Sequence, residues 1–155
     1  MTVDVVRLEI PAVPGYLALV RMVVAGTARA ELLLDDERVD DLRVIVSEAC
    51  TNAIEAVAAR VEDEGLSEWP PIEVEVRLST SRVEVVVTDE GRGFDPDSLV
   101  ALPAATDPSR LAVERGLGIP LIRALADEAE IDSGPKGTRV RAALYSAAPI
   151  PPGVP

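Results

Sequence analysis

The stretch VTDEGRGF (residues 87–94) runs from an apolar, β-branched segment directly into two glycines that flank an arginine. The apolar part completes a strand-like pattern that begins at residue 83 and ends at Asp89. Gly91 and Gly93 can adopt positive φ, and they allow the backbone to approach a flat surface closely. Two interpretations are open: a plain turn that Asp89 caps, or a loop against a ligand that the Asp89 carboxylate holds.

Composition limits the function classes that fit this chain. The 155 residues are about the size of one domain. A net charge of −12 repels phosphate backbones and therefore argues against direct nucleic-acid binding. The absence of histidine excludes a histidine-based triad, a histidine metal site and a histidine phosphoacceptor within this chain. A single cysteine, no signal-peptide pattern and no apolar stretch long enough to span a bilayer predict a cytoplasmic protein without membrane contact.

Hydrophobic periodicity predicts helices and strands in the order β-α-α-β-β-α-β-β. The predicted helices are 16–33, 34–61 and 118–128, and the predicted strands are 3–10, 72–78, 83–89, 129–133 and 138–145. This order indicates an α+β fold, a two-layer α/β sandwich with helices packed on one face of a mixed, mostly antiparallel sheet. Residues 90–116 look irregular, and such a long connection is usually functional or mobile. The Pro-rich tail, 147–155, is expected to be disordered.

Glu48 and Asn52 are four residues apart in the second predicted helix, so they share one helix face. That face lies beside the apolar stripe, at the rim between helix and sheet. A carboxylate and an amide in that position could hold Mg²⁺ and its waters, because Mg²⁺ prefers oxygen ligands. Alternatively, both side chains are solvated surface groups.

Gly116 and Gly118 precede the third predicted helix, where free N–H groups and the helix dipole favour a phosphate. The alternative is a helix entry with flexible glycines. The pattern is neither a P-loop nor a Rossmann GxGxxG motif. The segment GTRV (137–140) is a common turn at the start of a strand, and alone it indicates little.

The order and spacing of four segments resemble the N, G1, G2 and G3 boxes of the GHKL ATPase superfamily, which includes gyrase, sensor histidine kinases and heat-shock chaperones. The segments are SEACTNAI (47–54), VTDEGRGF (87–94), ERGLGIPLIRALADE (114–128) and IDSGPKGT (131–138). Within the superfamily, the chain looks most like the small bacterial anti-sigma factor serine kinases that act by partner switching. The resemblance implies a Bergerat ATP-binding fold in a histidine-kinase-like ATPase domain over 1–146, with a lid at about 95–115.

The resemblance also implies roles for individual residues. Asn52 matches the Mg²⁺ ligand, Glu48 the general base and Asp89 the acceptor of the adenine amine, with Thr138 beside it. The other implied ATP-binding residues are Gly91, Gly93, Arg115, Gly116, Leu117 and Gly118, and Arg110 and Arg115 are the basic candidates of the lid.

By the same resemblance, the protein would use Mg-ATP to phosphorylate a serine or threonine of a STAS-type anti-anti-sigma protein. It would also sequester a sigma factor and form a homodimer. Related kinases often carry histidine at the place of Ala56, and the lid is rich in alanine and poor in lysine. These departures keep open a non-catalytic, ATP-binding partner-switch module. The ATPase part of a histidine kinase fits less well, because no phosphoacceptor histidine or dimerisation helix precedes the domain.

Overall fold

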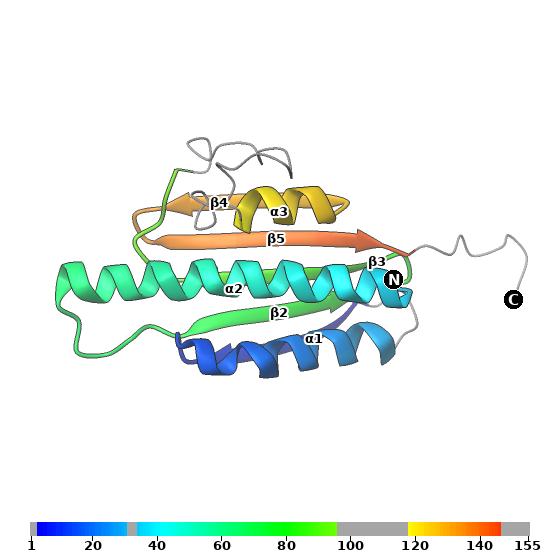
Figure 1. Cartoon of the computed structure of the whole chain (residues 1–155), viewed down its shortest axis with the longest axis horizontal. Coiled ribbons are helices and arrows are strands. Elements are labelled where there is room, and N and C mark those ends of the chain that lie inside the picture. The colour runs from blue at the N-terminus through cyan, green and yellow to red at the C-terminus, as the bar shows by residue number, and fades with distance from the viewer. Residues whose placement is uncertain (1–2, 31–33, 96–117, 147–155) are drawn as a thin grey trace, which may run out of the picture.

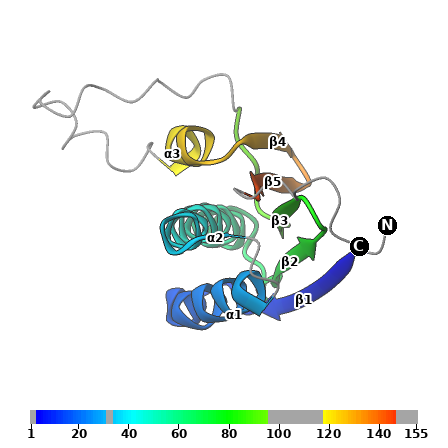
Figure 2. The same cartoon turned by 90° about the vertical axis from the view of Figure 1, so that its right-hand side faces the viewer.

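A computed structural model describes residues 3–30, 34–95 and 118–146 of the chain. Within these ranges the helices form one layer and a five-stranded sheet forms the other (Figures 1 and 2). This confirms the predicted α+β sandwich. No helix in the described part is long and apolar enough to cross a membrane.

The sheet has the strand order β1-β2-β3-β5-β4. Its strands are β1 (Asp4–Ile10), β2 (Ile72–Leu78), β3 (Arg82–Asp89), β4 (Glu128–Gly134) and β5 (Gly137–Tyr145). Every pairing between these strands is antiparallel, so the described sheet contains no parallel pair, although a mixed sheet was predicted. The central strand is β3, and its last residue, Asp89, lies opposite Thr138 of β5.

In the described part of the chain, three α-helices cover one face of the sheet, and α2 lies between α1 and α3 (Figure 2). They are α1 (Leu17–Ala30), which follows the 3₁₀ turn η1 (Pro14–Tyr16), α2 (Asp36–Glu64) and α3 (Gly118–Leu125). At the start of α2, the Asp35 carboxylate caps the helix by accepting a hydrogen bond from the backbone N–H of Arg38 at 2.8 Å. Gly65 ends the helix in the left-handed conformation, with φ of 62°.

The third helix is shorter than its predicted range of 118–128 and ends at Leu125. The backbone N–H of Asp127 donates to the Ala143 carbonyl of β5 at 2.9 Å, and β4 starts at the next residue. Pairing with β5 therefore overrides the local helical pattern, because both satisfy the same backbone groups. The predicted helix end at 31–33 and the predicted tail at 147–155 lie outside the described residues.

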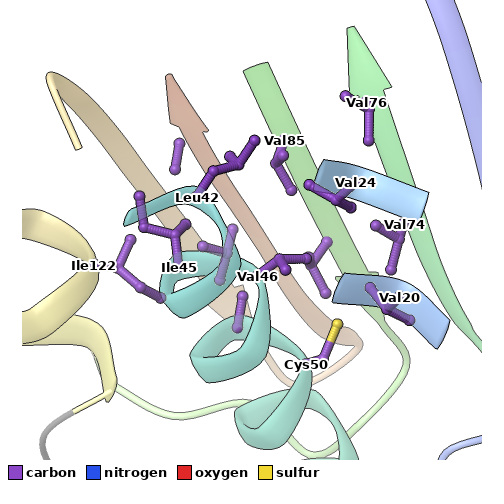
Figure 3. Close-up of a cluster of buried hydrophobic side chains, with 14 of the residues drawn as sticks. Val20, Val24, Leu42, Ile45, Val46, Cys50, Val74, Val76, Val85 and Ile122 are labelled. Atoms are coloured by element: carbon purple, nitrogen blue, oxygen red, sulfur yellow. The ribbon is translucent and has the colours of Figure 1, made fainter. Parts of the chain in front are cut away.

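Alternating strand residues and one stripe of each helix form the core between the layers (Figure 3). The labelled side chains are Val20 and Val24 of α1, Leu42, Ile45, Val46 and Cys50 of α2, Val74 and Val76 of β2, Val85 of β3, and Ile122 of α3. Burial raises the pKa of the Cys50 thiol to about 12, so this cysteine behaves as a core residue and not as a nucleophile.

The opposite face of the sheet carries alternating charges on neighbouring strands. Glu75 on β2 accepts hydrogen bonds from Arg7 of β1, at 2.9 Å, and from Arg77. Glu84 on β3 pairs with Arg77, at 3.1 Å, and with Arg141 of β5, at 3.7 Å. Burial alone would raise the pKa of the Glu75 carboxyl, but the hydrogen bonds from Arg77 and Arg7 hold this pKa below its ordinary value.

Arg38 connects the start of α2 with the segment between α3 and β4. Its guanidinium donates to the Asp41 carboxylate at 2.9 Å, to the Leu125 carbonyl at 3.0 Å and to the Asp127 carboxylate at 2.7 Å. The Leu125 carbonyl lies at the end of α3, where carbonyl groups lack helical partners. One side chain thus joins α2, α3 and the start of β4.

Replacement of Arg38 by alanine should lower the free energy of unfolding by about 1–2 kcal/mol, because a charge-assisted bond to a helix-end carbonyl is lost with two ion pairs. Urea denaturation measures this change. Arg43→Ala is the matched control, since Arg43 bonds the exposed Asp40 carboxylate one turn away, and its loss should cost about 0.5 kcal/mol or less. Equal losses for both variants would contradict the role of Arg38.

Candidate functional site

The carboxylate of Asp89 is held in place at the end of β3. Its side chain is buried, and Oδ1 accepts the backbone N–H of Gly91 at 2.7 Å. Burial raises the pKa of the Asp89 carboxyl, and hydrogen bonds from the Gly91 and Thr138 backbones oppose that rise. An ionised carboxylate can accept about four hydrogen bonds. Asp89 therefore caps the turn after β3 and retains capacity for a ligand's donor, so the two interpretations of this stretch are compatible.

Asp89, Thr138 and Ser133 form a polar row across three strands at one end of the sheet. Thr138 lies opposite Asp89 on one side and opposite Ser133 on the other. The Ser133 and Thr138 hydroxyl oxygens are 2.7 Å apart, and the backbone N–H of Phe94 donates to Ser133 Oγ at 2.9 Å. Sequence reasoning missed Ser133. The spacing of two between Ile131 and Ser133 indicates that both side chains lie on the same face of the sheet. Only the strand register shows that Thr138 is the partner of Ser133.

Two glycines let the loop after β3 pack against neighbouring elements. A Cβ on Gly91 would lie 2.5 Å from the Cβ of Ala56 on α2. Gly93 has φ of 74°, and a Cβ there would lie 2.1 Å from the Gly134 carbonyl oxygen in the β4–β5 turn. Side chains at either position would collide with these atoms, so the loop is fixed between α2 and the hairpin.

The structure brings Glu48 and Asn52 of α2 together with Gly118 at the start of α3. A Cβ on Gly118 would lie 2.9 Å from Asn52 Nδ2, 3.1 Å from Asn52 Oδ1 and 3.2 Å from Glu48 Oε2. Burial, followed by the negative charge of Glu55, raises the pKa of the Glu48 carboxyl. A carboxylate with a raised pKa is a better proton acceptor near neutral pH. Two segments 66 residues apart thus supply one polar cluster.

A row of residues along α2 connects this cluster with Asp89. Glu48, Asn52 and Ala56 follow one another at spacings of four, and Ala56 contacts the loop at Gly91, next to Asp89. Eight helical residues span about 12 Å, which is comparable to an extended nucleoside triphosphate. The site therefore has a hydrogen-bond acceptor, the Asp89 carboxylate, at one end. At the other end it has the oxygen and nitrogen atoms of Glu48 and Asn52.

Further along the same row, α2 holds the glycine loop through its backbone. Arg60 Nη1 donates to the Glu90 carbonyl at 2.6 Å, and the Arg92 N–H donates to the Ala56 carbonyl at 3.4 Å. Arg92 also pairs with Asp63 at 3.1 Å. Sequence reasoning missed these contacts, although the spacing of four from Asn52 through Ala56 to Arg60 could have indicated them.

The described side chains fit a metal that is bound together with a nucleotide. Glu48 and Asn52 offer the oxygen ligands that Mg²⁺ prefers. In the described ranges no group of three or more His, Cys, Asp or Glu could hold an ion. Glu48 or Asn52 would share a bound Mg²⁺ with phosphate oxygens and waters. The remaining predicted ligands, Arg110, Arg115, Gly116 and Leu117, and almost all of the predicted lid at 95–115 lie outside the described residues.

Comparison with known proteins shows the family of the chain. Residues 10–144 match the model of the histidine kinase-like ATPase domain. The chain is 37% identical over 138 residues to "Serine-protein kinase RsbW" of Bacillus velezensis, covering 85% of this chain and 80% of that protein. It is 33% identical to the RsbW of Bacillus subtilis over 135 residues, with coverage of 84% and 79%.

A solved structure confirms the fold independently of close sequence similarity. It is described as the SiaB–SiaC complex from Pseudomonas aeruginosa, and the matched chain superposes with a TM-score of 0.59 at 16% identity, covering 90% of this chain and 88% of that one. The family match over residues 10–144 implies ATP binding. The chain therefore belongs to the family of histidine kinase-like ATPase domains, and its relatives in that family include the RsbW serine-protein kinases.

Proposed function

We propose that this protein binds Mg-ATP and transfers the γ-phosphoryl group to a serine or threonine of a STAS-type anti-anti-sigma protein. Phosphorylation of that protein frees this one to sequester a sigma factor. The observation that carries the proposal is the row along α2, which connects the Glu48–Asn52–Gly118 cluster with the fixed carboxylate of Asp89. The names of the RsbW relatives support the kinase assignment.

Adenine fits the Asp89 end of the row. Its exocyclic amine is a donor, and Asp89 retains acceptor capacity after bonding two backbone N–H groups. The loop at Gly91 and Gly93 presents backbone without side chains beside this carboxylate. A flat base can therefore lie against the loop while its amine reaches Asp89.

The Glu48 end of the row fits the phosphates and the chemistry. When bound, Mg²⁺ neutralises charge that develops on the transferred phosphoryl group. The amide oxygen of Asn52 would hold that ion, and the Glu48 carboxylate, left free of it, would accept the proton of the substrate hydroxyl as it attacks. Since the pKa of Glu48 is raised by burial and by Glu55, its carboxylate is suited to this role.

Self-association is part of the proposal. The edge strand β1 exposes Val5 and Val6, and α1 exposes Leu19 and Met22. These side chains provide apolar area for a symmetric interface between two copies.

Asp89→Asn should weaken ATP binding by about tenfold or more, because an amide offers the adenine amine a poorer acceptor or a competing donor. Isothermal calorimetry with nucleotide-free protein measures the affinity. Asp132→Asn, the same change on an exposed residue of β4, should leave the affinity within about twofold. A parent protein that binds neither ATP nor ADP would refute the proposed function at its base.

Glu48→Gln should slow phosphoryl transfer by about 10²-fold or more while ATP affinity stays within a few-fold, since a general base need not hold the nucleotide. Asn52→Ala should lose Mg-ATP binding and transfer together. Transfer is followed from γ-labelled ATP to the anti-anti-sigma protein, beside nucleotide titrations.

The matched control for that experiment is Glu62→Gln, which removes an exposed carboxylate from the same helix and should change transfer by only a few-fold. Transfer by Glu48→Gln at the parental rate would show that the assigned base is wrong. If ATP and the anti-anti-sigma protein both bind but the parent transfers no phosphate, the non-catalytic partner-switch module becomes the better account.

Light scattering at micromolar concentration should give a mass of about 33 kDa, twice the 16.4 kDa chain, because closed two-fold dimers are the commonest assembly of soluble proteins. Double replacement of Leu19 and Met22 by aspartate should shift the mass toward the monomer. A monomeric parent would contradict the proposed dimer without affecting the nucleotide site.

A further inference from the structure

We propose that Arg38 is a positioning residue for the phosphate end of the site: by holding the far end of α3, it fixes the place of Gly118 beside Asn52. The inference rests on the proposed binding of Mg-ATP and deepens it, because it names a residue outside the site that determines how tightly the phosphates are held. It comes from the contacts at the two ends of one short helix.

The first residue of α3 has no spare room against α2. A Cβ on Gly118 would lie 2.9 Å from Asn52 Nδ2 and 3.2 Å from Glu48 Oε2, both closer than an ordinary van der Waals contact. The backbone of Gly118 therefore lies directly against the two side chains that are proposed to hold Mg²⁺ and to accept the proton. A small shift of α3 along its axis would change the space that remains there for the phosphates.

The other end of α3 is held by Arg38. Its guanidinium donates to the Leu125 carbonyl at 3.0 Å and to the Asp127 carboxylate, two residues later, at 2.7 Å. The last carbonyls of a helix lack helical partners, and a positive charge is favourable at that end of the helix dipole. The Asp127 carboxylate also accepts the backbone N–H of Tyr145 at 2.7 Å, so the contact is anchored to β5 as well.

Helix α3 relates the positions of its two ends because it is short and regular. Its eight residues span about 12 Å. Ile119 and Ile122 are buried in the core and hold the helix against the other elements (Figure 3). Apolar contacts are not directional, so they permit a displacement along the helix axis more easily than hydrogen bonds do. The bonds of Arg38 therefore set the axial position of α3, and with it the position of Gly118.

Arg38 differs from the neighbouring Arg43 in what it connects and in how far water reaches it. Only 23% of the Arg38 side-chain surface is exposed, compared with 36% for Arg43, whose partner Asp40 is 67% exposed. A charge-assisted bond that is partly shielded from water is screened less. The pair of Arg43 and Asp40 also lies within α2, so it cannot position α3.

The test separates the phosphate end of the site from the base end. Adenosine lacks phosphates and reports the base end alone, so the ratio of the Mg-ATP and adenosine affinities isolates the phosphates. Arg38→Ala should weaken Mg-ATP binding about fivefold while adenosine binding stays within about twofold. Arg38→Lys, which keeps the charge and three donors, should lie closer to the parent than Arg38→Ala does. Calorimetry measures Mg-ATP, and chemical-shift titration up to millimolar concentration measures adenosine.

Matched variants show whether Arg38 acts through α3. Asp127→Ala removes the partner beyond the end of α3 and should lower the same ratio; Arg38→Ala combined with it should add little, because both release one contact. Asp41→Ala removes the Arg38 partner on α2 itself, at 2.9 Å, and should keep the parental ratio, as should Arg43→Ala. Val76→Ala, a core change in β2 on the α1 side (Figure 3), should keep it too, although it lowers stability.

The possible failures are distinguishable. A parent that binds neither adenosine nor Mg-ATP refutes the proposed function and this inference with it. If the parent binds Mg-ATP but Arg38→Ala keeps the parental ratio, or weakens both ligands equally, the inference alone is refuted. An Asp41→Ala variant that lowers the ratio as much as Asp127→Ala would show that Arg38 does not act through α3. If Arg38→Ala does not fold, Asp127→Ala gives the same comparison.

Discussion

A buried carboxylate at the end of the central strand constrains the surrounding structure. Asp89 has few contacts with water, so backbone N–H groups must satisfy it, and those of Gly91 and Thr138 do. The chain must therefore turn back immediately after β3 and pair with β5 up to its last residue. A Cβ on Gly137 would lie 2.0 Å from the Asp89 carbonyl oxygen, so this pairing also requires glycine at the start of β5. The conformations of the loop after β3, of the start of β5 and of the end of β3 thus all depend on the buried Asp89 carboxylate.

Helix α2 connects the end of β3 with α3 through contacts along its length. At its start Arg38 bonds the end of α3, and near its end Arg60 holds the carbonyl of Glu90 in the glycine loop. Between these anchors, Glu48 and Asn52 lie against Gly118. One helix of 29 residues thus sets the distance between the two ends of the site. Catalytic groups carried on a regular element keep their spacing better than groups carried on loops.

The two faces of the sheet differ in polarity and in what covers them. The covered face is apolar except for the row at its end, and the helices bury it. No helix of the described residues lies over the other face (Figure 2), and arginines surround two buried glutamates on it, Glu75 and Glu84. Antiparallel sheets tolerate one solvated face, and ion pairs with arginines satisfy the two buried glutamates on it. The polar row of Asp89, Thr138 and Ser133 therefore lies on the helix side of the sheet.

The sequence by itself determined the element types, the shared face of Glu48 and Asn52, and the position of Asp89 at a strand end, because these depend on spacings of two to four residues. Only the tertiary structure decided the early end of α3, the strand order, the row of Asp89, Thr138 and Ser133, and the contact of Gly118 with Asn52. Hydrogen bonds and packing between segments far apart in the chain set these features. Local periodicity carries no information about which remote residues will be partners.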